Sequence, residues 1–469
     1  MKESGDLPDF RGIPWLPSVN LEVKTLLDRL EVKPSKSMGQ NFLTDSTIAQ
    51  SIVSEINPGR DDVVIEIGPG TGSLSRYLAG RVRRLILVEF DRRLADFLRV
   101  TFAGDSSVEV EHADATKFDL RSLFAEGPVK VIGNLPYSCG GEIIRKFLDP
   151  PTPVTKGVFM LQKEVAERLA AIPRTKAYGR VTLLTAVGWE VEQLFTLPPD
   201  PFYPRPAVDS SVVRVGCRLN GEIEPFNRQI FDRLLRCGFS QRRKQLKKLL
   251  PLGELSWSGV CKVLGIAERA RAEELCLDEW LQLTRLLDPH PLKDIPQCGD
   301  EIFDVVDDNN VVLGQSSRDE VHAKGLLHRA VHIFVFNILG ELYLQKRSSS
   351  KDSSPGLWDS SASGHLGVGE DYQSAAAREL REELGVQAPV EEISALAACP
   401  ATGWEFVRLF RCEHGGPFLS PCSEVETGTF LSPEIIDQWV SRRPQDFAPG
   451  FVECWSICSS GMPSRVIPN

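Results

Sequence analysis

The stretch VVIEIGPGTG, residues 63–72, decides the fold of the first half of the chain. It begins as a strand-sized, mostly apolar run, and glycine then stands at every second position, Gly68, Gly70 and Gly72. Glycines let a ligand approach the main chain closely, and a strand–loop–helix unit directs backbone amides and a helix N-terminus at that ligand. Because a pyrophosphate favours the different spacing Gly-x-Gly-x-x-Gly, we interpret this loop as a site for an adenosyl cofactor.

Strand-sized runs continue beyond this loop and alternate with helical patterns. We expect buried strands at residues 63–67, 85–89, 108–111, 129–133, 157–161 and 211–215. The alternation predicts an α/β fold with a doubly wound, mostly parallel, Rossmann-like sheet. From residue 226 to residue 287 leucines recur at three- and four-residue spacing, which predicts a small helical domain.

Two acidic residues follow later strands, at the edge of the sheet where such folds bind ligands. Glu89 ends the strand after the glycine loop, where a carboxylate can accept hydrogen bonds from both ribose hydroxyls. Asp114 follows the third strand and can accept a hydrogen bond from an adenine amino group. Solvated acids at strand ends are the alternative, and the common register of the loop, Glu89 and Asp114 disfavours it.

The tetrapeptide Asn134-Leu135-Pro136-Tyr137 follows the fourth strand at the same edge. The exocyclic nitrogen N6 of adenine is a poor nucleophile because its lone pair is delocalised into the ring. The side-chain carbonyl of Asn134 and the backbone carbonyl of Leu135 can accept the N6 hydrogens, which localises that lone pair. Tyr137 offers a stacking face for a base extruded from its helix or loop. An Asn-Pro turn with a packed tyrosine is the alternative, but the tetrapeptide after this loop predicts methyl transfer to nitrogen.

Positive charge is concentrated in one part of a chain whose net charge is −10. Residues 1–300 hold 41 Lys and Arg against 40 Asp and Glu, whereas residues 301–469 hold 13 against 24. The densest basic segment is predicted to be a helix with Leu246, Leu249 and Leu250 on its buried side. Its basic members are Arg242, Arg243, Lys244, Lys247 and Lys248. A solvated helix face is the alternative, but the density favours contacts with RNA phosphates.

Together with flanking motifs, these residues resemble the KsgA/RsmA family of small-subunit ribosomal RNA adenine dimethyltransferases over about residues 33–287. The flanking motifs are GQNFL at 39–43, QKEVAERL at 162–169, YGR at 178–180, FYPRPAVDS at 202–210 and FSQRRK at 239–244. The resemblance implies a class I methyltransferase sheet with a small helical RNA-binding domain. It implies S-adenosylmethionine as cofactor, bound by Gln40, Asn41, Leu43, Gly68, Gly70, Glu89, Asp114 and Asn134.

The same resemblance implies the substrate, a pair of adjacent adenosines in a hairpin loop near the 3′ end of small-subunit (16S) rRNA. Each adenosine would be dimethylated at N6 during ribosome biogenesis. Phe202 would form a second aromatic wall opposite Tyr137. The chain departs from the family at Cys139-Gly140-Gly141, which puts the rate or extent of dimethylation in question.

A second catalytic pattern, the 23-residue stretch GHLGVGEDYQSAAARELREELGV at 364–386, matches the Nudix box at every defined position. We expect a helix at 372–384, with Asp371 as N-cap and Gly385 after its C-terminus. The carboxylates of Glu379, Glu382 and Glu383 then share one helix face, where their repulsion favours a bound Mg²⁺ or Mn²⁺. Such an ion would activate water to cleave a phosphoanhydride. Alternating charges on a solvated helix are the alternative.

The C-terminal third resembles the Nudix hydrolases over about residues 301–451, and more narrowly the branch related to isopentenyl-diphosphate isomerase. The motifs that carry this are HRAVH at 328–332, LQKRS at 344–348 and WDSSASGH at 358–365. The resemblance implies an α/β/α sandwich and a small diphosphate substrate. Residues 360–363 lack the isomerase's catalytic cysteine, so hydrolysis is favoured. His328, His332 and His365 could touch the substrate or be structural.

These patterns predict a methyltransferase domain at 1–217, a helical RNA-binding domain at 218–290, a proline-containing linker at 291–300 and a Nudix domain at 301–469. Scattered cysteines, the lack of a secretory pattern and the lack of a membrane-spanning run predict a cytoplasmic protein. Three alternatives stay open: an RNA-binding assembly factor, a large-subunit rRNA methyltransferase, and a nucleotide-sensing Nudix module. Leu135 and the helical tail favour the small subunit, and the oligomeric state is not predicted.

Overall fold

The structure, a computed structural model, describes residues 20–35, 39–219, 221–288 and 299–461. Its contacts divide the chain into two compact units. The first holds residues 1–218, 236–249 and 269–277, and the second holds 219–235, 250–268 and 278–469. Most of the predicted linker lies outside the described residues, and the predicted domain boundaries remain predictions. No helix in the described part is long and apolar enough to cross a membrane.

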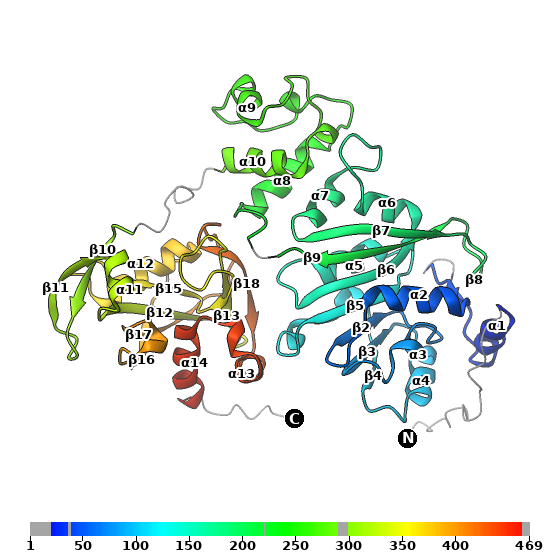
Figure 1. The fold of residues 1–469 in the computed structure, drawn as a ribbon, viewed down its shortest axis with the longest axis horizontal. Coiled ribbons are helices and arrows are strands. Elements are labelled where there is room, and N and C mark those ends of the chain that lie inside the picture. Colours follow the sequence, from blue (N-terminus) through cyan, green and yellow to red (C-terminus); the bar gives the residue numbers. More distant parts are fainter. Residues whose placement is uncertain (1–19, 36–38, 220, 289–298, 462–469) are drawn as a thin grey trace. The chain divides into compact units, whose positions relative to one another are not determined.

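The first unit is built on a seven-stranded sheet with the order β4-β3-β2-β5-β6-β9-β7 (Figure 1). Its strands are β2 (Val63–Ile67), β3 (Arg84–Glu89), β4 (Val108–His112), β5 (Val129–Asn134), β6 (Val154–Gln162), β7 (Trp189–Leu197) and β9 (Ser210–Cys217). All six predicted strands are present, and β2 has the predicted bounds. The first five in sequence pair in parallel, while β9 pairs antiparallel with both β6 and β7. The pattern did not predict β7.

Helices cover both faces of this sheet because its central strands are apolar on both sides. Val64 of β2 packs with α2 (Ser46–Ile56) and α4 (Arg92–Thr101), whereas Ile65 packs with α5 (Gly140–Leu148). The remaining elements of this part are α1 (Asn20–Arg29), β1 (Phe42–Leu43), α3 (Ser75–Leu78), α6 (Lys163–Leu169), α7 (Arg180–Ala186) and β8 (Phe202–Tyr203). The doubly wound α/β fold is therefore confirmed.

The segment from 226 to 287 is helical but more broken than predicted. It contains α8 (Arg228–Gly238), η3 (Leu246–Lys248), α9 (Trp257–Leu264), η4 (Ala272–Glu274) and α10 (Leu277–Leu286). The helix predicted for the basic stretch is wrong, since only the short 3₁₀ turn η3 forms there. Its leucines pack without it: Leu246 and Leu250 are buried, and the backbone N–H of Leu246 donates to the carbonyl of Ala270. The backbone N–H of Leu246 thus makes a long-range hydrogen bond in place of the local one that a helix would give it.

The second unit is built on another seven-stranded sheet, which is mixed. Its strands are β12 (His328–Phe336), β13 (Leu342–Arg347), β14 (Trp358–Asp359), β15 (Ala362–His365), β16 (Glu391–Leu396), β17 (Glu405–Glu413) and β18 (Val425–Leu431). β12 pairs with β13 antiparallel, which confirms the predicted hairpin, and with β17 parallel. A separate hairpin of β10 (Ile302–Val306) and β11 (Val312–Ser317) precedes α11 (Arg318–Lys324).

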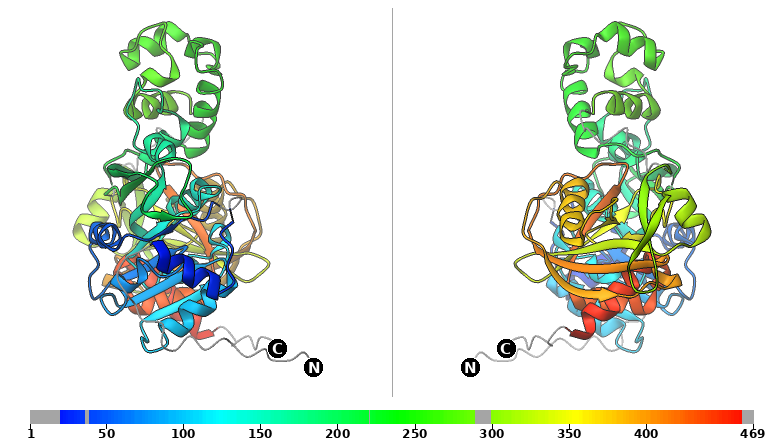
Figure 2. Two further views of the ribbon diagram at one scale, coloured as in Figure 1. Left: turned by 90° about the vertical axis from the view of Figure 1, so that its right-hand side faces the viewer. Right: turned by 90° about the vertical axis from the view of Figure 1, so that its left-hand side faces the viewer.

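Helices lie on both faces of this sheet as well (Figures 1 and 2). α12 (Tyr372–Leu384) has the predicted bounds, packs against Ile333 of β12 and is capped by Asp371, whose carboxylate accepts from the N–H of Ser374. Phe334, on the other face, packs against α14 (Pro449–Gly461) near α13 (Pro433–Arg442). The helix, its caps and the α/β/α sandwich are thus confirmed.

Candidate active sites

A cavity of about 360 Å³ opens at the carboxyl ends of β2, β3 and β5. It is lined by all of the residues predicted to bind the cofactor: Gln40, Asn41, Leu43, Gly68, Gly70, Glu89, Asp114 and Asn134. They come from segments far apart in the sequence, and the parallel sheet gathers them because its strands end at the same edge. The size lies within the range of cavities that bind small molecules.

The glycine loop has a backbone that other residues rarely adopt. Gly68, Gly70 and Gly72 all have positive φ angles, of 64°, 59° and 79°. A Cβ atom on Gly70 would lie 2.9 Å from the Phe42 ring, so the loop needs glycine for space as well as for conformation. The N–H of Gly68 donates to the carbonyl of Val88, which joins the loop to the end of β3.

Glu89 is buried at the end of β3, with both carboxylate oxygens held by backbone amides. One accepts from the N–H of Gly70 at 2.9 Å and the other from the N–H of Asp91 at 2.9 Å. Burial raises the pKa of this carboxyl group. Each oxygen keeps a lone pair, so the side chain can still accept from two hydroxyl groups of a bound ribose.

Asp114 begins a short 3₁₀ turn after β4 and lines the same cavity. Its carboxylate accepts from the hydroxyl of Thr116 at 2.7 Å and from the N–H of the same residue at 2.9 Å. These hydrogen bonds lower the pKa of Asp114, so the group is an anionic acceptor at neutral pH. An adenine amino group is a matching donor.

Asn134, at the end of β5, is held in one orientation by the segment before β1. Its side-chain Nδ2 donates to the backbone carbonyl of Asn41 at 2.6 Å, which leaves its Oδ1 without a partner among the described residues. The backbone carbonyl of Leu135 likewise has no donor there. A Cβ atom on Gly39 would lie 2.8 Å from the backbone nitrogen of Tyr137, so Gly39 packs directly against the tetrapeptide. Two acceptor oxygens are thus available at its start.

The two residues predicted to be aromatic walls, Tyr137 and Phe202, are not among the residues that line this cavity. Tyr137 is partly exposed, and its hydroxyl lies 2.5 Å from the hydroxyl of Ser210. Phe202 is only 2% exposed, packs in the core beside β1 and does not line the cavity. Leu135 is buried beneath the site and contributes its backbone, whereas Pro136 lines the cavity. How Phe202 and Tyr137 would stand around a target base stays a prediction.

Some lining residues were missed by the sequence interpretation. Phe90 lines the cavity and is 57% exposed, an unusual position for a phenylalanine. Cys139, from the segment where the chain departs from the KsgA/RsmA family, and the nearby Glu142 line it as well. Phe90 directly follows Glu89, which was predicted to bind the ribose. An apolar residue at that position could have indicated a further contact with the cofactor.

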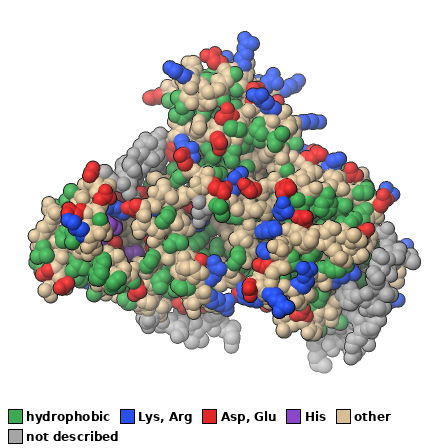
Figure 3. Space-filling model, in the orientation of Figure 1, with side chains coloured by type: hydrophobic (Ala, Val, Ile, Leu, Met, Phe, Trp, Pro, Cys, Tyr) green, Lys and Arg blue, Asp and Glu red, His purple; other side chains and the backbone are tan. Residues whose placement is uncertain are grey.

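The predicted RNA-binding side chains are all exposed. Arg242 is held by an ion pair with Glu273 and by the carbonyl of Thr175. For Arg243, Lys244, Lys247 and Lys248 the described part of the chain shows no ion pair. Figure 3 shows Lys and Arg side chains over the helical segment around α9, interspersed with acidic ones. Four of the five predicted residues are therefore available for phosphates.

The second unit has a cavity of about 470 Å³ beside α12. The box glutamates Glu379, Glu382 and Glu383 line it together, as their spacing on one helix face predicts. Basic residues line it too, namely Arg318, Arg347, Lys351 and Arg378. Carboxylates that gather a cation beside basic groups that meet phosphate form a donor set suited to a metal–diphosphate complex.

The box glutamates differ in their surroundings. Burial raises the pKa of Glu379 to about 8 and that of Glu383 to about 7. Glu383 accepts from Nε2 of Gln345 at 3.0 Å and from the N–H of Ser363 at 3.1 Å. Arg378 donates to Glu379 at 2.7 Å and to Glu382 at 3.1 Å. Part of the mutual repulsion of the carboxylates is thus offset by Arg378, and a divalent cation would offset the rest.

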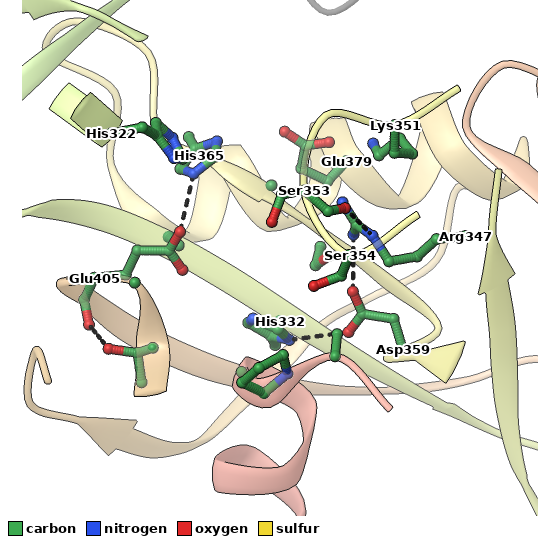
Figure 4. A pocket seen from close by; sticks show the side chains of 18 of the residues that line it. His322, His332, Arg347, Lys351, Ser353, Ser354, Asp359, His365, Glu379 and Glu405 are labelled. Carbon is green, nitrogen blue, oxygen red and sulfur yellow. Dashed lines mark hydrogen bonds and ion pairs between the residues drawn. The ribbon is translucent and has the colours of Figure 1, made fainter. Parts of the chain in front are cut away.

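Three histidines form a separate cluster in the same cavity region. Ligand atoms of His322, His328 and His365 all lie within 4.8 Å of one another. Glu405 accepts from Nε2 of His365 at 3.0 Å (Figure 4). It also lies 3.6 Å from Nε2 of His328. Burial lowers the pKa of His365 to about 4, which keeps its ring neutral. Its Nδ1 accepts from Arg318 at 3.2 Å, so Arg318 would have to move before that nitrogen could bind a metal. Imidazoles with a carboxylate can hold a transition metal such as Zn²⁺ or Mn²⁺.

The sequence interpretation missed His322 and Glu405, and it assigned His328 and His365 either a substrate contact or a structural role. The four residues come from α11, β12, β15 and β17, and no short spacing in the sequence connects them. His332, also singled out, lies elsewhere on the cavity wall, beside Asp359.

The sheet order, glycine loop, strand-end acids and Asn134 tetrapeptide define a class of proteins, the Rossmann-like methyltransferases that act on a base amino group. Residues 32–288 match the ribosomal RNA adenine dimethylase family, and the chain belongs to that family. It also carries a NUDIX domain over residues 326–446. It is therefore an enzyme of the rRNA adenine dimethyltransferase family fused to a NUDIX hydrolase domain.

The first part of the chain is similar to several known proteins. The chain is 36% identical over 272 residues to ribosomal RNA small subunit methyltransferase A of Clostridioides difficile, covering 56% of this chain and 94% of that protein. It is 37% identical over 278 residues to the protein of the same name from Geobacillus kaustophilus, covering 57% and 95%. A solved dimethyladenosine transferase from Plasmodium falciparum is 25% identical, with a TM-score of 0.43, covering 52% of this chain and 95% of that one.

Proposed function

We propose that the first part of the chain dimethylates N6 of two adjacent adenosines in a hairpin loop near the 3′ end of small-subunit (16S) rRNA. S-adenosylmethionine supplies the electrophilic methyl group. Glu89 accepts hydrogen bonds from the ribose, Asp114 accepts from the adenine amino group, and the glycine loop allows close approach. This dimethylation serves ribosome biogenesis in the cytoplasm.

The orientation of Asn134 is the observation that carries this proposal. Because its Nδ2 is bonded to the carbonyl of Asn41, Oδ1 and the carbonyl of Leu135 are the free acceptors. They take the two N6 hydrogens of the target adenine and localise the nitrogen lone pair toward the methyl group. The methylated amine is acidic and gives its proton to water, so a strong base is unnecessary. Stacking on Phe202 as well as on Tyr137 would require Phe202 to leave its buried place.

Labelled S-adenosylmethionine and under-methylated small ribosomal subunits test this function directly. We expect label at two neighbouring adenosines, and loss of at least about 100-fold in rate with Asn134→Ala, since an electrostatic contact made in the transition state is removed. Asn57→Asp, at the left-handed C-cap of α2 outside the cavity, is the control, because Asp tolerates the positive φ of 50°. Label on large subunits alone would favour the alternative substrate. Full biological function of Asn134→Ala would favour an assembly factor.

We propose that the NUDIX domain is a hydrolase that cleaves a small diphosphate with Mg²⁺ or Mn²⁺ held by Glu379, Glu382 and Glu383. Such an ion offsets phosphate charge and supplies activated water. The convergence of these carboxylates with Arg347 and Lys351 on one cavity carries the proposal. Isomerase chemistry is disfavoured because Ser360 and Ser361 are fully buried and no cysteine lines the cavity among the described residues.

A diphosphate library with Mg²⁺ tests the hydrolase. We expect phosphate release from at least one compound and loss of at least about 100-fold with Glu382→Gln, which keeps the size of the side chain but not its charge. Glu391→Gln, an exposed glutamate on β16, is the control. Release from no compound would favour a sensing module.

A further inference from the structure

One wall of the NUDIX cavity is formed by residues outside the box and outside the histidine cluster. Ala448, Pro449 and Gly450, at the start of α14, line the cavity together with His332. Figure 4 shows His332 beside Asp359, next to the beginning of this helix. Nothing in the box chemistry uses this wall, so its polar groups are available for another part of a substrate.

His332 presents a hydrogen-bond donor to the cavity. Its side chain is only 7% exposed, and its Nδ1 lies 2.6 Å from the hydroxyl oxygen of Ser360. Ser360 is fully buried, and within the described residues its hydroxyl has no other partner. A buried hydroxyl hydrogen needs an acceptor, so it is donated to Nδ1 and the ring hydrogen is on Nε2. That Nε2–H has no partner in the described part of the chain.

The start of α14 adds further donors. Helices leave their first backbone N–H groups without acceptors, and α14 begins with proline, which has none. The N–H groups of Gly450 and Phe451 have no acceptor among the described residues. A Cβ atom on Gly450 would lie 3.4 Å from Nε2 of His332, so glycine keeps the space between ring and helix open. The positive end of the helix dipole favours an anion there.

The carboxylate of Asp359 does not cancel the preference of this wall for an anion. Asp359 lies 4.0 Å from Nδ1 of His332, but its carboxylate accepts from Arg347 at 2.8 Å and from the N–H of Ser360 at 2.7 Å. Its charge is therefore matched by the guanidinium group of Arg347.

Apart from histidines, the described residues that line the cavity include no aromatic side chain. A nucleobase would therefore find no Phe, Tyr or Trp ring on which to stack. We propose that His332 and the first amides of α14 bind a second anionic oxygen group, a phosphate or carboxylate, at the far end of a compact, non-nucleoside diphosphate. This inference rests on the proposed hydrolase function and names the substrate class for it.

Three matched compounds test the inference: propyl diphosphate, 3-phosphopropyl diphosphate and 3-carboxypropyl diphosphate. Calorimetric titration with the full chain and Mg²⁺ gives the affinity of each. We expect the wild type to bind at least one of the two anionic compounds about tenfold or more tightly than propyl diphosphate, as one charge-assisted hydrogen bond provides. Which compound gains more identifies phosphate or carboxylate as the preferred group.

Two variants remove the site by different means. His332→Phe deletes the Nε2 donor, and Gly450→Leu fills the space at the exposed start of the helix without touching the Ser360 hydrogen bond. Either should reduce the preference for the anionic compounds to about twofold or less. His414→Phe, outside the cavity, should keep the wild-type preference. Gly450→Leu decides the matter if the buried His332→Phe does not fold.

The outcomes separate this inference from the hydrolase itself. Equal affinity of the wild type for all three compounds, or an unchanged preference in Gly450→Leu, overturns the anion site even where propyl diphosphate is hydrolysed. A preference that both variants abolish supports the site even where no compound is cleaved, and in that case the hydrolase proposal alone fails. Binding of none of the compounds overturns the anion site, while the hydrolase is judged by the diphosphate library.

Discussion

At the scale of single residues, the sequence predicted the residues that line the first cavity better than the position of the residues expected to face the target base. Glycines at 68 and 70 and acids at 89 and 114 are recognisable because each requires a particular residue type at a strand end. Phe202 was expected to face the target base, yet it is buried, since a motif does not reveal which side of a short strand faces the core. The histidine cluster was missed because four distant elements build it.

Gly70→Ala should weaken cofactor binding without unfolding the protein. The added methyl group meets the Phe42 ring at 2.9 Å, in a backbone with φ of 59°, so the loop must shift away from the ligand. We expect the dissociation constant for S-adenosylmethionine, measured by calorimetry, to rise about tenfold or more, because strain of this kind costs about 1–3 kcal/mol. Gly80→Ala, which also has a positive φ but open space around it, is the control. Unchanged affinity in Gly70→Ala would contradict the role of the loop.

Glu66 should make the stability of the first unit depend on pH. Burial raises its pKa to about 8 from an ordinary value of 4.5, and Ser75 donates to it at 2.7 Å. The folded state thus favours the protonated form, so its contribution to stability is fully present below pH 4.5 and is lost as the pH rises through 8. Glu66→Gln stays neutral, and its melting temperature relative to wild type should increase from pH 5 to pH 9. Glu111→Gln, exposed on β4, should show no such trend.

At the scale of elements, the parts with strong local signals were predicted well. The strand at 63–67 and the helix at 372–384 have the predicted bounds, because an apolar run ends in glycine in one case and caps close both ends in the other. The basic stretch at 242–248 had helical leucine spacing but lacks a helix, because Leu246 bonds to the carbonyl of Ala270 instead. β7 alternates polar and apolar residues only weakly, so its own sequence did not predict a strand. The strand forms because it pairs with β9, which follows it in the chain.

The carboxylate face of α12 should couple metal binding to pH. In the metal-free domain, burial raises the pKa of Glu379 to about 8 and that of Glu383 to about 7. Each stabilises the fold while protonated, and that contribution is lost as the pH rises through these values, when the ionised groups begin to attract a cation. The increase in melting temperature caused by Mg²⁺ should therefore grow from pH 6 to pH 8.5, as thermal denaturation can measure. Glu383→Gln should reduce this growth, and a pH-independent increase would refute the coupling.

At the scale of the whole molecule, two complete sites belong to two compact units. Every predicted cofactor residue lies in the first unit and every box glutamate lies in the second. The charge follows the same division, since residues 301–469 hold 24 acidic residues against 13 basic ones. An acidic NUDIX part is a poor surface for RNA, whereas four free basic side chains near residue 245 suit phosphates. The sequence predicted two separate domains because the motifs of each family lie in their own stretch of the chain.

The two activities should therefore be separable within the full chain. Because each unit has its own hydrophobic core and its own site residues, a change that removes one reaction leaves the groups of the other in place. Glu382→Gln should abolish diphosphate hydrolysis while rRNA methylation stays within about twofold of wild type, and Asn134→Ala should do the reverse, as expected for independent sites. The double variant should show both losses and no more. A methylation rate that falls about tenfold in Glu382→Gln, with an unchanged melting temperature, would instead establish communication between the sites.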